Sequence, residues 1–188
     1  MDTLLPRILP EDLAPAIIQS CHQCELCQHG TRVIWGEGNP AASVLVILDN
    51  PGAREDKNGL PFLCGTRETL QRAAYEAGLD SDALYITYIL KCQPKRAYNK
   101  QTARSICIEY LWKQLASVNP AIVMCFFEDP AVEVKRLRDK VHLVRNYQVI
   151  TSYHPLAVRR RPVLYKYFLQ DWRLAASQLH QLNNHARA

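Results

Sequence analysis

The fold of this chain is decided by the stretch Ser43-Val44-Leu45-Val46-Ile47-Leu48, which runs directly into Asp49-Asn50-Pro51-Gly52. A short and nearly unbroken apolar run that ends in turn-forming residues is typical of a buried strand followed by a turn. The same pattern recurs three times further along the chain, at residues 84–90, 121–127 and 147–152. The sequence therefore predicts four buried strands.

Helical patterns fill the intervals between these expected strands. Apolar residues recur at helical spacing in residues 66–77, 103–118, 130–140 and 163–183. Strands that alternate with helices form a parallel sheet with helices on both faces. We therefore expect an α/β fold, a three-layer α/β/α sandwich with a central, mainly parallel four-stranded sheet, in a single domain that spans residues 1–188.

The ends of these strands indicate where a functional site should lie. In sheets of this kind, ligands bind beyond the carboxyl ends of the strands. The first expected strand ends at Asp49-Asn50, the second at Lys91-Cys92 and the fourth at Tyr153-His154-Pro155. A carboxylate, a cysteine and a histidine should therefore converge on one edge of the sheet.

The composition is that of an ordinary globular protein, with 188 residues, 48% of them hydrophobic and 22% charged. No apolar run approaches the roughly 20 residues of a membrane helix, and residues 1–7 lack the features of a secretory signal, so we expect a cytoplasmic protein. The net charge of +5 is modest. Several basic residues lie near the strand-end motifs, however, where they suit phosphate contacts: Lys91, Lys95, Arg96, Lys100 and Arg159-Arg160-Arg161.

The seven cysteines indicate metal binding or scattered core thiols rather than disulfides, because their number is odd and no secretory signal is present. Cys21-His22-Gln23-Cys24 is a C-x-x-C knuckle, and Cys92 and Cys107 follow with fourteen residues between them. Two sulfurs from a tight turn and two from a distant loop can complete a tetrahedral site.

Spacing alone leaves the occupant of that site open. Zinc sites usually repeat the short knuckle, whereas the wider second pair leaves room for a larger object such as a cubane cluster. Cys27 is a possible substitute ligand, because Cys24-Glu25-Leu26-Cys27 is also C-x-x-C. Buried free thiols are the alternative reading, since cysteine packs as a small hydrophobe.

Short motifs follow one another in a fixed order between Cys21 and Trp172. They are the knuckle with Leu26, Gly36-Glu37-Gly38-Asn39-Pro40, Pro51-Gly52, Glu55-Asp56-Lys57, Gly59, Pro61-Phe62, Lys91-Cys92-Gln93-Pro94 with Cys107, and Tyr153-His154-Pro155. Together they resemble the iron–sulfur uracil-DNA glycosylases, the bacterial and archaeal family 4 branch of the uracil-DNA glycosylase superfamily. In that family, Gly36 to Pro40 would precede the first strand.

The resemblance implies an activity, a cofactor and a partner. The activity is hydrolysis of the N-glycosidic bond of a flipped-out uracil or a related deaminated or modified base in DNA, leaving an abasic site. The cofactor is a structural [4Fe-4S] cluster held by Cys21, Cys24, Cys92 and Cys107, with Cys27 as a spectator. No lysine is an obvious Schiff-base nucleophile, so we expect a monofunctional enzyme of base excision repair, acting as a monomer.

The resemblance also assigns roles to residues at the expected sheet edge. His154 would donate a hydrogen bond to the departing base. Asp49 stands where the family carries a glutamate that positions or activates water, and Asn50 is the alternative water-holding residue. Phe62 would stack on the flipped base, and Gly52 would lie against it.

Two departures from the family pattern predict an altered base pocket. Tyr88 stands where the family carries an asparagine that reads the hydrogen-bonding edge of the base, and a phenol offers one hydroxyl instead of an amide. The family's glycine-rich phosphate turn is replaced by Leu63-Cys64-Gly65-Thr66-Arg67, in which Thr66 and Arg67 are expected to contact DNA. A modified base, for example in defence against phage DNA, is therefore an alternative substrate.

The segment after His154-Pro155 is expected to contact the duplex. In the family a leucine in this loop fills the gap left by the flipped base; here Val158 or Arg159 would fill it, and Arg159, Arg160 and Arg161 would hold the backbone. A second alternative is a DNA-binding or damage-sensing relative that has kept the fold and the cluster and lost the chemistry.

Overall fold

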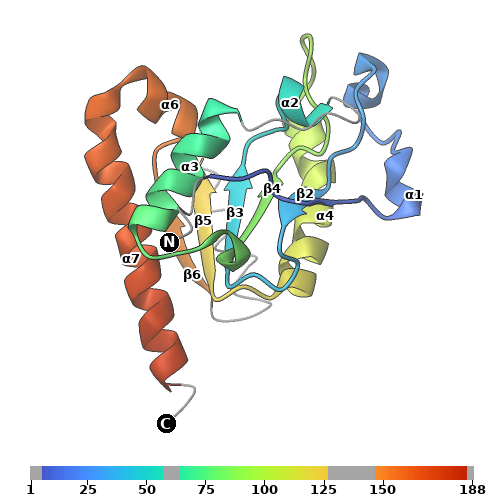
Figure 1. Ribbon diagram of the computed structural model, residues 1–188. Coiled ribbons are helices and arrows are strands. Elements are labelled where there is room, and N and C mark those ends of the chain that lie inside the picture. Colours follow the sequence, from blue (N-terminus) through green and yellow to red (C-terminus); the bar gives the residue numbers. More distant parts are fainter. Residues whose placement is uncertain (1–5, 57–63, 127–146, 186–188) are drawn as a thin grey trace.

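The computed structural model describes residues 6–56, 64–126 and 147–185, which are built around a six-stranded sheet (Figure 1). The strand order is β1-β2-β4-β3-β5-β6. The strands are β1 (Glu11–Asp12), β2 (Gly36–Gly38), β3 (Val44–Leu48), β4 (Leu84–Tyr88), β5 (Ile122–Phe126) and β6 (Gln148–Thr151).

Four of these strands form the parallel centre of the sheet, in the order β4-β3-β5-β6. They confirm the four strands predicted from the apolar runs. The short strands β1 and β2 extend this centre at one edge, where they pair antiparallel to one another and to β4. The Gly36-Glu37-Gly38 segment is thus itself a strand. Gly38 adopts a φ of 109°, and an added Cβ would lie 2.4 Å from the Leu84 carbonyl oxygen, so only glycine fits there.

The helices cover both faces of the sheet, as expected for a three-layer sandwich (Figure 1). The long helices are α3 (Gly65–Glu76), α4 (Lys100–Val118) and α7 (Tyr165–His185). The short ones are α1 (Ala16–Gln19), α2 (Ala53–Asp56) and α6 (Pro155–Arg160), with 3₁₀ turns at Glu25–His29, Ser81–Ala83 and Pro162–Leu164. The helix expected at residues 130–140 lies outside the described residues.

Alternating side chains of the central strands supply two separate cores. Val44, Val46 and Leu48 of β3 pack under α3, α6 and α7, together with the aromatic residues Phe126 and Trp172, whose ring centroids lie 5.9 Å apart. The intervening residues of β3 pack against α4 on the opposite face. Each strand is therefore apolar on both sides, which explains the unbroken apolar runs in the sequence.

Helix α4 begins at a well-formed cap. The side chain of Asn99 accepts a hydrogen bond from the Thr102 amide at 3.0 Å, and Asn119 ends the helix in the left-handed conformation with φ of 50°.

Among the described residues, no helix is both long enough and apolar enough to cross a membrane.

Candidate active site

A cleft of about 340 Å³ lies at the carboxyl ends of β3 and β4. It combines residues that are far apart in the chain, because parallel strands end on the same edge of the sheet. Seven residues selected from the sequence line it: Asp49, Asn50, Gly52, Thr66, Arg67, Tyr88 and His154. A volume of this size is typical of sites that bind small molecules or single chemical groups.

Asp49 is the first residue after β3 and is held at both its backbone and its side chain. Its carbonyl oxygen accepts a hydrogen bond from the Leu90 amide at 2.9 Å. Its carboxylate lies 3.2 Å from a guanidinium nitrogen of Arg104, which comes from α4. The two side chains are 18% and 29% exposed, so the pair is shielded but still open to the cleft.

Asn50 is exposed at the mouth of the cleft. Its amide nitrogen donates to the Pro51 carbonyl at 2.8 Å, which stabilises the turn. Within the part of the chain that the structure describes, its Oδ1 accepts no hydrogen bond. Asn50 therefore both shapes the turn and offers an acceptor to a molecule in the cleft.

His154 lies at the N-terminus of α6, where Pro155 begins the helix. Its Nδ1 caps this helix by accepting a hydrogen bond from the Leu156 amide at 3.1 Å. An amide can only donate, so Nδ1 carries no proton and the neutral imidazole must carry its proton on Nε2. The local fold thus selects the tautomer that can donate to a ligand.

Gly52 is less available than the sequence indicated. Its amide donates at 2.7 Å to Oε2 of Glu55, a residue of α2, so the Gly52 amide already has a partner within the protein. Burial would raise the pKa of Glu55, but Arg67 and Arg54, together with the Gly52 amide, outweigh it and lower the pKa below its usual range. Glu55 is therefore an ionised carboxylate at the wall of the cleft.

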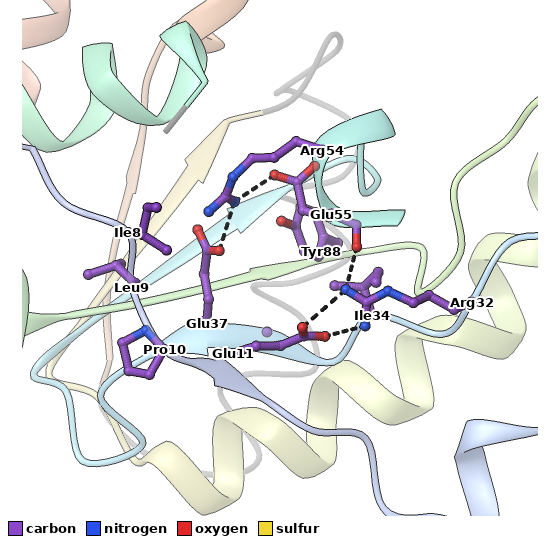
Figure 2. A pocket seen from close by; sticks show the side chains of 11 residues that line it. Ile8, Leu9, Pro10, Glu11, Arg32, Ile34, Glu37, Arg54, Glu55 and Tyr88 are labelled. Atoms are coloured by element: carbon purple, nitrogen blue, oxygen red, sulfur yellow. Dashed lines mark hydrogen bonds and ion pairs between the residues drawn. The ribbon is translucent and has the colours of Figure 1, made fainter. Parts of the chain in front are cut away.

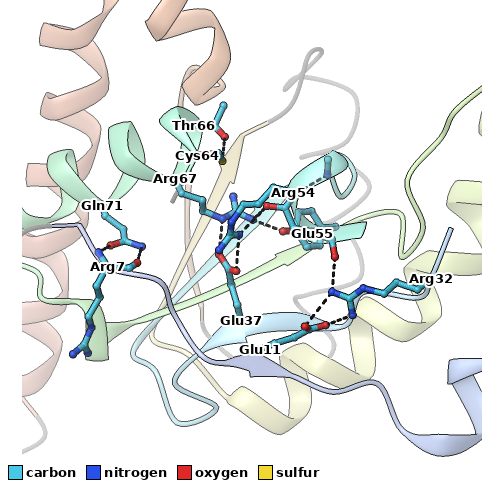
Figure 3. A network of polar contacts seen from close by, with 12 residues as sticks. Arg7, Glu11, Arg32, Glu37, Arg54, Glu55, Cys64, Thr66, Arg67 and Gln71 are labelled. Carbon is cyan, nitrogen blue, oxygen red and sulfur yellow. Dashed lines mark hydrogen bonds and ion pairs between the residues drawn. The ribbon is translucent and has the colours of Figure 1, made fainter. Parts of the chain in front are cut away.

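Arg67 is only 2% exposed, which corrects its expected role as a DNA contact. It lies in a buried network of charges (Figure 3). Its Nε donates to Glu37 Oε1 at 2.5 Å, and its Nη2 donates to the Tyr88 hydroxyl and lies 3.5 Å from Glu55 Oε1. Arg54 completes the network with contacts of 2.8 Å to Glu37 and 2.9 Å to Glu55.

Tyr88 lies at the wall of the cleft with its hydroxyl turned to Arg67, and it is 1% exposed. Burial, with Glu55 and Glu37, raises the pKa of its phenol well above the usual value, despite the opposing charge of Arg67. The phenol is therefore neutral. Its oxygen accepts from Arg67, so only its own proton remains to be donated.

A second cavity, of about 350 Å³, lies behind this wall (Figure 2). Tyr88 and Glu55 line both cavities, so they and the charge network separate the two. The N-terminal segment Ile8-Leu9-Pro10 covers one side of it, and Arg32 binds the Glu11 carboxylate with contacts of 2.5 and 3.0 Å.

The segment after His154 differs from the expectation. Val158 is 2% exposed and packs in the core beneath α6, so it is not placed to enter a duplex. Leu156 is 36% exposed and lines the cleft instead. The three arginines are exposed, but the guanidinium of Arg159 lies over Gly65, where an added Cβ would come within 2.3 Å of it.

The four expected cluster ligands lie in one region: Cys21 and Cys24 precede the 3₁₀ turn Glu25–His29, Cys92 follows β4, and Cys107 lies in α4. Cys92 and Cys107 are 8% and 5% exposed and pack with Leu26, while Cys24 packs against the same group. Burial, with the nearby thiols of Cys24 and Cys21, raises the pKa of Cys107 to about 11. None of the seven cysteines, all of which lie in the described ranges, forms a disulfide.

These cysteines are not arranged as a compact site for one ion. In the described residues, no group of three or more His, Cys, Asp or Glu side chains could hold a metal ion. Cysteine sulfurs are the donors that an iron–sulfur cluster takes, so the chemistry of the four side chains fits such a group.

Lys91 directly precedes Cys92 and is buried, which corrects its expected role at phosphates. Its ammonium donates to Gln114, Thr87 and the Tyr88 carbonyl at 2.5, 2.9 and 2.7 Å. Burial lowers its pKa to about 7. Lys91 therefore anchors the chain between β4 and the second cysteine pair.

Arg104 and Tyr98 also line the cleft, although no sequence motif pointed to them, and Lys100, one of the basic residues expected near phosphates, lies beside them. Arg104 precedes Cys107 by three residues on a predicted helix, and that spacing places both side chains on one face. This spacing is the feature of the sequence from which Arg104 could have been placed near the site. Phe62, expected to stack on the base, lies outside the described residues.

Comparison with known proteins agrees with this geometry. A model of the uracil DNA glycosylase superfamily matches residues 35–175. The chain is 30% identical over 173 residues to the type-4 uracil-DNA glycosylase of Archaeoglobus fulgidus, covering 83% of this chain and 86% of that protein. It is 26% identical over 175 residues to the Thermotoga maritima type-4 enzyme, covering 85% and 90%.

A solved structure shows the same fold. The crystal structure of Pedobacter heparinus SMUG2 superposes with a TM-score of 0.50 at 15% identity, covering 76% of each chain. The chain belongs to the uracil DNA glycosylase superfamily, and the edge of its sheet brings Asp49 and His154 to one cleft. The curated relatives that it resembles over most of its length are type-4 uracil-DNA glycosylases.

Proposed function

We propose that this protein is a monofunctional DNA glycosylase that removes uracil from DNA. The observation that carries the proposal is the cleft itself, in which a carboxylate from the end of β3 and a histidine from the start of α6 meet. Breaking an N-glycosidic bond produces positive charge on the sugar and negative charge on the departing base. The cleft supplies a group for each.

In this mechanism the flipped nucleotide enters the cleft as a single extrahelical residue. The Nε2 proton of His154 forms a hydrogen bond with the carbonyl oxygen of the departing base and stabilises its negative charge. The Asp49 carboxylate stabilises the cationic sugar and accepts a proton from the water that attacks C1′. Asn50 Oδ1 is a second acceptor for that water. The products are the free base and an abasic site.

The exposed arginines and Leu156 are placed for the duplex. Arg160 and Arg161 are exposed at the C-terminal end of α6, where they suit contacts to phosphates on either side of the flipped nucleotide. Leu156 lines the cleft and is partly exposed, so it replaces Val158 as the residue proposed to fill the gap in the stack.

Incubation with a defined set of duplexes tests the proposed function. We expect release of uracil from a duplex with one uracil, measured by mass spectrometry of the free base, and an intact sugar–phosphate strand until it is treated with alkali. An Asp49→Ala, Asn50→Ala variant provides the inactive control. Binding of the uracil duplex without release of any base would contradict the proposal and favour a damage-sensing role.

A modified base is the second candidate substrate, and the Tyr88–Arg67 contact favours it. The Tyr88 hydroxyl is bound to Arg67 and the side chain is 1% exposed, so Tyr88 presents no amide to the hydrogen-bonding edge of a base. Hypoxanthine, xanthine and hydroxymethyluracil therefore belong in the same set of duplexes as uracil. Faster release of one of these than of uracil would shift the assignment.

We also propose that Cys21, Cys24, Cys92 and Cys107 hold a [4Fe-4S] cluster. Cys24, Cys92 and Cys107 pack around Leu26, with the second pair buried, and Cys21 lies near enough to Cys24 and Cys107 to affect the pKa of each. When bound, such a cluster ties the N-terminal knuckle to the start of α4. The residues of the chain that line the cleft perform the steps at the base.

Matched cysteine variants test this ligand set. Cys21→Ala is expected to lose bound iron and the visible absorbance of the cluster, whereas Cys27→Ala keeps both, because Cys27 is a spectator. Iron analysis and electron paramagnetic resonance of the reduced proteins provide the measurement. Loss of iron in Cys27→Ala with retention in Cys21→Ala would reverse the assignment.

A further inference from the structure

Arg104 connects the helix of the second cysteine pair to the catalytic carboxylate. It lies on α4, one turn before Cys107, and its Nη2 lies 3.2 Å from Asp49 Oδ1. Both side chains line the cleft. No motif that identified the site in the sequence includes Arg104.

The backbone on each side of this contact is fixed. The carbonyl of Asp49 is bound by the Leu90 amide at 2.9 Å, so the main chain after β3 has little freedom to shift. On α4, Ala103 and Cys107 are 1% and 5% exposed and pack in the same apolar group. Arg104 therefore extends from a rigid helix to a carboxylate on a rigid strand end.

With the main chain fixed, the orientation of the Asp49 carboxylate is set by its side-chain torsion angles. An aspartate can rotate about χ1 and χ2, and only some of these orientations direct an oxygen at a water in the cleft. An arginine that contacts one oxygen from a fixed direction selects among them. At 29% and 18% exposure, water competes with this contact less than at an open surface.

From this geometry we infer that Arg104 is a positioning residue, which holds the Asp49 carboxylate in the orientation that accepts a proton from the attacking water. Arg104 acts through Asp49 and not on the base. The inference rests on the proposed glycosylase activity and adds a residue to it. A basic residue at a cleft that binds DNA has an obvious alternative role in phosphate binding, so the experiment must separate rate from affinity.

The test measures the single-turnover rate of base release at saturating enzyme, and separately the Kd for a uracil duplex. Arg104→Gln is expected to lower the saturating rate roughly 10- to 100-fold, as for a misplaced catalytic group, with Kd nearly unchanged. Arg104→Lys, which keeps the charge near Asp49, should recover part of that rate. Lys113→Gln removes the same charge from an exposed position of the same helix and should alter neither quantity.

A double variant provides the decisive comparison. If Arg104 acts through Asp49, the Asp49→Asn, Arg104→Gln variant should be no slower than Asp49→Asn alone. Weaker binding with an unchanged saturating rate in Arg104→Gln, or multiplicative rate losses in the double variant, would overturn the inference and assign Arg104 to phosphate binding. Melting temperature and iron content show whether each variant is folded. If Arg104→Gln does not fold, Arg104→Lys replaces it in the comparison with Asp49→Asn. Failure of the wild type to release any base would instead refute the proposed function itself.

Discussion

Replacing His154 with alanine is expected to lower the rate of base release about 100- to 1000-fold, which is the usual effect of removing one preorganised donor. The reason is specific to this fold: Nδ1 accepts from the Leu156 amide, so Nε2 holds the only proton that the neutral ring can donate. Duplex binding should remain. Single-turnover kinetics and a binding titration with the same uracil duplex provide the measurement.

The same substitution also removes a helix cap, so a second variant is needed. Asparagine is a good N-cap residue, whereas loss of a cap costs about 1 kcal/mol. His154→Asn should therefore recover the melting temperature lost in His154→Ala, without recovering the rate. If His154→Asn regains most of the activity, the role of His154 is to cap α6 and not to donate to the base.

Arg67→Met is expected to lower the free energy of unfolding by about 3–5 kcal/mol, because it leaves a buried carboxylate without one of its partners. Of its two ion pairs with described residues, Glu37, at 7% exposure, would keep the one with Arg54. Urea unfolding measures the change. In the double variant Glu37→Gln, Arg67→Met, the change at Glu37 removes the unpaired negative charge and should recover part of the lost stability. A buried ion pair is tolerated at this position, whereas a single buried charge is not.

An exposed arginine on the same helix provides the control. Arg72 pairs with Glu68 at 2.7 Å, but both side chains are about half exposed, so Arg72→Ala should cost less than about 1 kcal/mol. A loss for Arg67→Met no larger than that for Arg72→Ala would show that the network adds no stability.

The pH dependence of the free energy of unfolding gives a further check on the network. The pKa of Glu55 is lowered in the folded protein, so its contribution to stability is present above the ordinary glutamate pKa and is lost as the pH falls through the lowered value.

The central fold could be predicted because its signal is local. The apolar runs that contain β3 and β5 are buried on both faces, and each gave a strand within a residue or two of its observed bounds. The edge strands β1 and β2 were missed because they have only two and three residues, and β2 contains two glycines. Strands this short form only where a neighbour already presents a free edge.

The membership of the cleft was predictable for the same reason. Asp49 and His154 each follow a parallel strand, and parallel strands place their carboxyl ends together. What a side chain contacts there was not predictable. Arg67 and Val158 were expected at the DNA and are buried instead, since burial depends on how α3 and α6 pack over the sheet.

By itself, the sequence determined the α/β class, the order of the central elements, the sheet edge that carries the site and the cysteine motif, because each depends on local periodicity or on spacing along the chain. Only the tertiary structure decided that Arg104 meets Asp49, that Arg67 binds Tyr88, and that the cap of α6 sets the tautomer of His154. The first two contacts join residues 55 and 21 positions apart, and the third requires the backbone torsion angles that His154 adopts where the chain enters α6. Local patterns carry no record of such distances and angles, which follow from packing.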